Sequence, residues 1–191
     1  MNLPLIDQQN FKNKDYTTKR LPKAEYIDCT FTNCNFESAD LSNTNFIECD
    51  FTGCNFSNAN VMHTSFNTIN FKNCKVLGVL FQNCNPFLLS FSFTDCILNL
   101  SSFYQVKINH TKFLKCIMHQ VDFTESAAKH VEFQHCDLKH AIFQQTNLEH
   151  SDFTSASNFN INPSTNRIKH AIFSKDNMLG LLMDFNIKIN S

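Results

Sequence analysis

Nine cysteines and a series of regularly spaced histidines are the residues of this sequence best suited to chemistry. Thiolates and imidazoles bind zinc, and thiols also pair as disulfides. An odd number of cysteines cannot form a complete disulfide framework, and no two of them have the C-x-x-C spacing of a zinc site. We therefore expect free thiols with a structural role, with a metal or redox role as the alternative. The cysteines are Cys29, Cys34, Cys49, Cys54, Cys74, Cys84, Cys96, Cys116 and Cys136.

The histidines His110, His130 and His150 are evenly spaced at four repeats of five, and His170 follows at the same interval. If residues at this spacing share a face, the first three imidazoles form a column on the outside of the protein, which His170 continues if the intervening loop restores the register. Such a column could bind a metal or respond to pH. The alternative is that these residues only stack on the surface. We predict no metal site and leave the role of the column open.

Motifs for catalysis are absent from the sequence. It contains no G-x-S-x-G, phosphate-binding loop, Rossmann fingerprint or H-E-x-x-H. The net charge is −1, from 16 basic and 17 acidic residues, which gives no general attraction to nucleic acid or membranes. No stretch reaches the roughly 18 to 20 apolar residues of a membrane span, and the N-terminus lacks the pattern of a signal peptide. We expect a cytoplasmic, non-enzymatic protein without a cofactor, without direct nucleic-acid binding and without a membrane.

A five-residue period organises all of these residues. One series of large residues runs every five positions from Phe11 to Phe81, and a second runs from Phe93 to Phe153. The step of 12 between the two series places two extra residues around 85–91. Each cysteine lies two positions before a large-residue position, which for Cys84 is the next position of the first series and holds Pro86 at the register break. Small apolar cysteines at these positions are therefore predicted to fill a core.

Neither common element has a period of five. Residues five apart drift around a helix, and an odd spacing would turn every second large residue of a continuous strand outward. The chain must therefore turn once per repeat, and four right-angled turns close a coil of four repeats. Stacked coils would bury the large residue and the residue two before it. On this basis the cysteines form two columns, with Cys34, Cys54 and Cys74 in one and Cys96, Cys116 and Cys136 in the other.

The pattern small-x-Phe/Leu-x-x in "DCTFTNCNFESADLSNTNFIECDFTGCNFSNAN" resembles that of the pentapeptide-repeat proteins, and the resemblance covers roughly residues 11–157. It implies an all-β fold, a right-handed quadrilateral parallel β-helix. With the mid-chain break and the tail "NFNINPSTNRIKHAIFSKDNMLGLL", the chain looks most like the bacterial quinolone-resistance branch. Members of that branch are typically homodimers joined through a short apolar C-terminal segment. They bind the type II topoisomerases DNA gyrase and topoisomerase IV, where the rod mimics duplex DNA.

Two regions are expected. Residues 1–157 form the β-helix, with the register break at about 85–91 either projecting as a small loop or kinking the rod between two stacks. Residues 158–191 form a loop, a last partial coil and an apolar segment, with Ser174 as a possible N-cap of a short helix. This segment either caps its own rod or pairs with a second copy. The candidate dimer residues are Met178, Leu179, Leu181, Leu182 and Phe185.

Acidic residues gather in two parts of the chain. Residues 21–60 carry a net charge of −5 and residues 121–160 a net charge of −4, whereas residues 61–120 carry +4. Duplex DNA has one charge per about 1.7 Å, so these patches form a partial mimic at most, or simply a solvated face. The leading hypothesis is a topoisomerase-binding rod that protects against quinolones. The alternative is an interaction rod with another protein partner, such as an effector or a toxin-immunity factor. The candidate partner-binding residues are Asp28, Glu48, Asp50, Asn85, Pro86, Phe87, Glu132 and Asp152.

Overall fold

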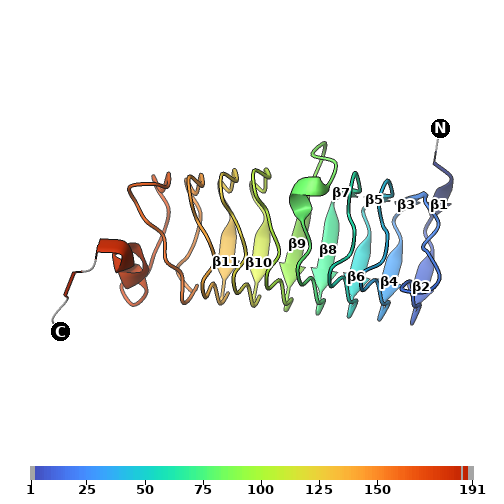
Figure 1. Cartoon of the computed structure of the whole chain (residues 1–191), viewed down its shortest axis with the longest axis horizontal. Coiled ribbons are helices and arrows are strands. Elements are labelled where there is room, and N and C mark those ends of the chain that lie inside the picture. Colours follow the sequence, from blue (N-terminus) through green and yellow to red (C-terminus); the bar gives the residue numbers. More distant parts are fainter. Residues whose placement is uncertain (1–2, 186, 189–191) are drawn as a thin grey trace.

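The five-residue repeats stack into a rod, with the N-terminus at one end and the C-terminus at the other (Figure 1). The computed structural model describes residues 3–185 and 187–188. Residues 1–2 of the expected β-helix, and residues 186 and 189–191 of the expected C-terminal region, lie outside the described residues. Within the described part of the chain, no helix is long and apolar enough to cross a membrane.

Two parallel sheets run along neighbouring faces of the rod. Register pairs such as Tyr26 with Phe46 set the regular coil at four repeats, as the period predicts. The four-sided parallel β-helix is confirmed. One sheet contains β1 (Leu5–Asp7), β3 (Glu25–Ile27), β5 (Asn45–Ile47) and β7 (Ser65–Asn67). The other contains β2 (Asn10–Lys12), β4 (Thr30–Thr32), β6 (Asp50–Thr52), β8 (Ile69–Lys72), β9 (Phe91–Thr94), β10 (Lys112–Leu114) and β11 (Glu132–Gln134).

A left-handed residue turns the chain at almost every corner. It lies two positions after the large residue, as in Asp28 with φ 49° and Asn33 with φ 51°. Side chains other than glycine rarely adopt this region, but asparagine, aspartate and histidine do so more often than the rest. This preference explains the histidines, because seven of the eight occupy such corners: His63, His110, His130, His135, His140, His150 and His170.

Phenylalanine ladders fill the interior. Every large-residue position from Tyr16 to Phe81 and from Phe93 to Phe153 is buried, as the period predicts. Phe51 illustrates the packing: its ring stacks on those of Phe31 and Phe71, with centroids 4.8 and 5.3 Å away. Rings on adjacent faces meet edge to face. Both arrangements suit the charge distribution of aromatic rings.

The cysteines are all free and buried, and they correct one prediction. Instead of two separate columns, six of them form a single column, because the Cys74 N–H donates to the Cys96 Sγ at 3.4 Å across the register break. Each thiol of this column donates to a carbonyl of the preceding coil, as Cys74 does to Phe51 O at 3.3 Å. In the neighbouring column, burial raises the pKa of Cys49 to about 12, so that thiol is uncharged at neutral pH. The six residues are Cys34, Cys54, Cys74, Cys96, Cys116 and Cys136.

The register break forms a projecting loop (Figure 1). It does not divide the rod into two stacks along the second sheet, since β8 pairs with β9 and Ile69 aligns with Phe91 across the break. The 3-10 helix η1 (Phe81–Asn83) leads into the loop. Phe91 occupies a position that is usually small, and its ring lies 5.2 Å from that of Phe81. Phe91 also packs against Phe93 and Phe103, whereas Pro86, at a large-residue position, is exposed to solvent.

The C-terminal segment covers the last coil. The expected short helix consists of two 3-10 turns, η2 (Met178–Leu181) and η3 (Met183–Phe185). Ser174 Oγ accepts the Asn177 N–H at 3.3 Å, so Ser174 caps the turn before η2. Gly180 packs so closely that a Cβ there would lie 2.6 Å from Phe159 O, which makes glycine necessary for this contact.

Candidate functional site

Carboxylates line one corner of the rod and the face beside it, and they are exposed at Asp28, Glu48 and Asp50. Asp28 and Glu48 occupy the same corner on successive coils, because the residues before them, Ile27 and Ile47, are register partners. Asp50 lies on the adjacent face, and the strand register continues its column through Asn70, Ser92 and Lys112 to the last two candidates, Glu132 and Asp152. Five of the predicted partner-binding residues therefore share one side of the molecule.

The two ends of this carboxylate side differ in charge pairing. Lys112 Nζ lies 3.4 Å from Glu132 Oε1 and reduces the negative charge in the C-terminal half. Among the described residues, Asp28, Glu48 and Asp50 form no ion pair, although Asp50 accepts a hydrogen bond from Asn70 Nδ2 at 2.8 Å. The N-terminal half therefore presents the stronger anionic patch.

The four predicted histidines continue the corner of Asp28 and Glu48 beyond the register break. Their imidazole rings stack with each successive pair of centroids 4.8 Å apart, and His170 joins the column as expected. In the described part of the chain, no group of three or more His, Cys, Asp or Glu residues is arranged to hold a metal. Desolvation, neighbouring imidazoles and Lys129 lower the pKa of His130. We call His110, His130, His150 and His170 the histidine ladder.

His130 in this ladder makes the stability of the protein depend on pH. The folded-state pKa of His130 is lowered, so the unfolded chain binds more protons, and stability should fall as pH drops through the ordinary pKa of about 6.5. Asparagine also suits the left-handed corner, so His130→Asn should fold normally. We expect its melting temperature to decrease less than that of wild type when the pH is lowered from about 7.5 to about 5. Differential scanning calorimetry measures this. The matched control is His140→Asn, a corner histidine outside the ladder, which should behave as wild type; equal losses in both variants would contradict the prediction.

The projecting loop presents apolar side chains to solvent. Asn85 Oδ1 accepts the Phe87 N–H at 3.1 Å, and Asn85 Nδ2 donates to Ser65 Oγ at 3.1 Å. Asn85 thus anchors the loop, while Phe87 is 73 % exposed. Pro86 is also exposed. Leu88, which the sequence did not single out, is 60 % exposed in a left-handed conformation. The three predicted loop residues therefore divide into an anchor and an exposed apolar tip.

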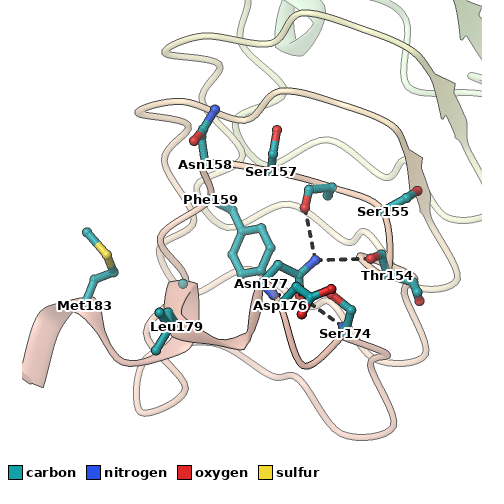
Figure 2. A pocket seen from close by; sticks show the side chains of 12 residues that line it. Thr154, Ser155, Ser157, Asn158, Phe159, Ser174, Asp176, Asn177, Leu179 and Met183 are labelled. Carbon is teal, nitrogen blue, oxygen red and sulfur yellow. Dashed lines mark hydrogen bonds between the residues drawn. The ribbon is translucent and has the colours of Figure 1, made fainter. Parts of the chain in front are cut away.

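The C-terminal segment forms a second apolar surface. Met178, Leu179 and Phe185 are exposed, whereas Leu181 and Leu182 are half-buried and Leu181 packs against the core. A cavity of about 480 Å³ lies between this segment and the last coil (Figure 2). Met183 borders it and is 63 % exposed, although it is not among the candidate dimer residues from the sequence.

Asn177 closes the backbone edge beside this cavity. Its Nδ2 donates to the carbonyls of Phe153 at 2.7 Å and Ala156 at 3.0 Å, and Figure 2 shows it between the tail and the last coil. The carbonyl of Phe153 also accepts the Ala156 N–H at 3.0 Å, and Asn177 supplies these carbonyls with a side-chain donor where the repeat pattern ends. No sequence pattern marks Asn177, because its partners lie more than a full coil away along the chain.

The repeats identify the family of the chain. The family model described as the pentapeptide repeat region matches residues 24–86 and 78–153. The chain belongs to the pentapeptide-repeat family. This agrees with the left-handed corners, the buried large residues and the four-repeat coil of the structure.

A solved structure shares the fold of this pentapeptide-repeat protein. A trypsin-treated form of QnrB1, a plasmid-mediated fluoroquinolone resistance protein, matches with a TM-score of 0.53 and 17 % identity over 100 % of both chains. At this identity the likeness concerns the fold alone. HetL from the cyanobacterium Nostoc, a protein involved in heterocyst differentiation regulation, matches with a TM-score of 0.46 and 13 % identity, covering 91 % of this chain and 88 % of that chain. No curated protein matches the chain significantly.

Proposed function

We propose that this pentapeptide-repeat protein is a non-enzymatic, rod-shaped binding protein that engages DNA gyrase or topoisomerase IV as a partial DNA mimic and thereby protects against quinolones. The observation that carries the proposal is the row of carboxylates along one side of the rod, formed by Asp28, Glu48 and Asp50 and continued by Glu132 and Asp152. A surface that binds duplex DNA is positively charged, so a rod with aligned negative charge is complementary to it.

The projecting loop also supports this function. The projecting loop with Phe87 would add an apolar contact to an otherwise polar side of the rod. We also propose that residues 1–157 form the partner-binding β-helix and that residues 158–191 join two copies.

The carboxylates remain sparser than DNA phosphates, since a column supplies at most one per strand spacing of about 4.8 Å. We therefore expect a moderate affinity that falls with salt.

The test is a gyrase supercoiling assay in the presence of ciprofloxacin, with increasing amounts of this protein. We expect supercoiling to be rescued at low protein and inhibited at high protein. The combined variant Asp28→Asn, Glu48→Gln and Asp50→Asn should need about tenfold more protein for rescue, because three exposed charge contacts of up to about 1 kcal/mol each are weakened. Asp95→Asn is the matched control, as another exposed corner acid. If neither gyrase nor topoisomerase IV responds to the wild-type protein, the topoisomerase function is wrong and an interaction rod with another protein partner becomes the better hypothesis.

Dimerisation through the tail gives a separate prediction. Leu179 and Met183 are exposed apolar residues beside the rod end. Charged residues buried in an interface without a partner cost several kcal/mol, so Leu179→Asp with Met183→Asp should turn a dimer into a folded monomer. Analytical ultracentrifugation measures the mass. Met62→Asp, on the exposed rod surface, should leave the dimer intact, and a monomeric wild-type protein would refute the prediction.

A further inference from the structure

A cavity lies under the projecting loop, apart from the carboxylates and the tail. Its volume is about 380 Å³, within the range of small-molecule sites and too small for a folded partner. Pro86 and Leu89 line it from the loop, Phe81 and Cys84 from the segment before the loop, and Tyr104 and Val106 from the following coil. Because the two extra residues bow the chain outward here, the following coil lacks the close cover that the regular coils have.

The lining is mostly apolar and aromatic. Phe81 and Val106 are buried, whereas Leu89 and Tyr104 are half-buried and add an aliphatic and an aromatic side chain to the lining. Such walls favour an aromatic ring, which packs well against other aromatic faces and edges. The aliphatic walls offer that ring no hydrogen bonds, so the body of a ligand must itself be apolar.

Of the residues that the structure describes, Lys107 has the one charged side chain that lines the cavity, and it favours a ligand with a negative charge. Lys107 lines the cavity and is exposed, and within residues 3–185 and 187–188 it forms no ion pair. Its neighbour on the next coil is Ala127, so the column places no carboxylate beside it there. No acidic residue lines the cavity, and the nearby Glu125 accepts a hydrogen bond from Gln105 Nε2 at 2.7 Å. An anionic group on the ligand would therefore meet an uncompensated positive charge.

We propose that this cavity binds a small aromatic carboxylate, with its ring against Leu89, Tyr104 and Val106 and its carboxylate at Lys107. The site follows from the register break, since a regular coil would close over the next one. This proposal does not depend on topoisomerase binding. A ligand here would hold the loop against the rod and would thereby set the position of Phe87 at its tip.

Methyl NMR of the full chain, titrated with 2-naphthoate and its neutral analogue 2-naphthamide, tests the proposal. We expect the Leu89 and Val106 methyl signals to shift with a dissociation constant on the order of 10⁻⁴ M for the carboxylate. The buried methyl groups of Val131 and Leu148 lie outside the cavity lining and should not move. The amide should bind two- to fivefold more weakly, about the strength of an exposed charge contact.

Two variants separate the ring site from the charge. Lys107→Gln should bind carboxylate and amide equally, whereas Lys139→Gln, an exposed lysine elsewhere on the rod, should keep the wild-type preference. Val106→Trp should fill the cavity and abolish binding of both compounds. The proposal is overturned if the wild-type Leu89 and Val106 methyl signals stay unmoved at about 1 mM ligand, or if wild-type protein binds the amide as tightly as the carboxylate.

Discussion

Replacing Phe51 by aspartate should leave no folded protein, and replacing it by alanine should lower the free energy of unfolding by about 3–5 kcal/mol. Phe51 has no exposed surface and contacts five aromatic rings, from the coils before and after and from its own. Alanine would leave a cavity in the ladder. Aspartate would bury a charge without a partner, which costs more than a protein of this size can supply.

Chemical denaturation followed by circular dichroism measures both effects. Thr52→Asp is the matched control, because its half-buried side chain lies next to Phe51 on the outer side of the same strand, β6. We expect this control to unfold cooperatively, with a free energy of unfolding within about 1 kcal/mol of wild type. A Phe51→Asp protein that melts cooperatively would show that the inward and outward positions are wrongly assigned.

Removing two residues should be tolerated in the projecting loop and destructive in a regular coil. Deleting Phe87 and Leu88 restores the coil between Ile69 and Phe91 to the regular length of four repeats, so the coil can still close. We expect the melting temperature to change by only a few degrees, since both side chains are largely exposed.

Deleting Gln134 and His135 removes a left-handed corner from a coil without spare length. Two residues span about 6.5 Å of extended chain, so the remaining residues cannot reach around the core. Buried side chains such as Leu138 and Phe143 would lose their stacking partners, at about 1.5–3 kcal/mol each. We expect loss of the cooperative transition.

Calorimetry and limited proteolysis distinguish the two deletions. Similar melting of both would mean that the coils tolerate length changes anywhere, and the register of the rod would then not depend on the repeat. Unfolding of both would instead mean that the loop residues Phe87 and Leu88 are part of the core, in conflict with their exposure.

Much of the candidate site could be predicted because it follows from the coil. Residues four repeats apart share a position, so the alignment of Glu132 with Asp152 and of the histidine ladder was predictable. The left-handed backbone conformation of the corners was not predicted from the sequence. Histidine adopts this conformation more readily than most residues, which explains its presence at positions 110 and 130 without any role for imidazole chemistry.

The fold and the inward and outward positions of each repeat follow from the amino-acid sequence alone. This information is local: a period of five with large and small residues two apart can bury both positions only in a turning, stacked coil. Other features depend on where the two extra residues of the register break lie, and only the three-dimensional structure shows that. The two extra residues are accommodated in the projecting loop, so the strands on either side stay in register. Cys74 therefore lies beside Cys96, and the corner of Asp28 continues into the histidine ladder. The same loop forms the cavity next to Lys107. The three-dimensional structure also decided how Asn177 covers the last coil, because that contact joins residues that no repeat relates.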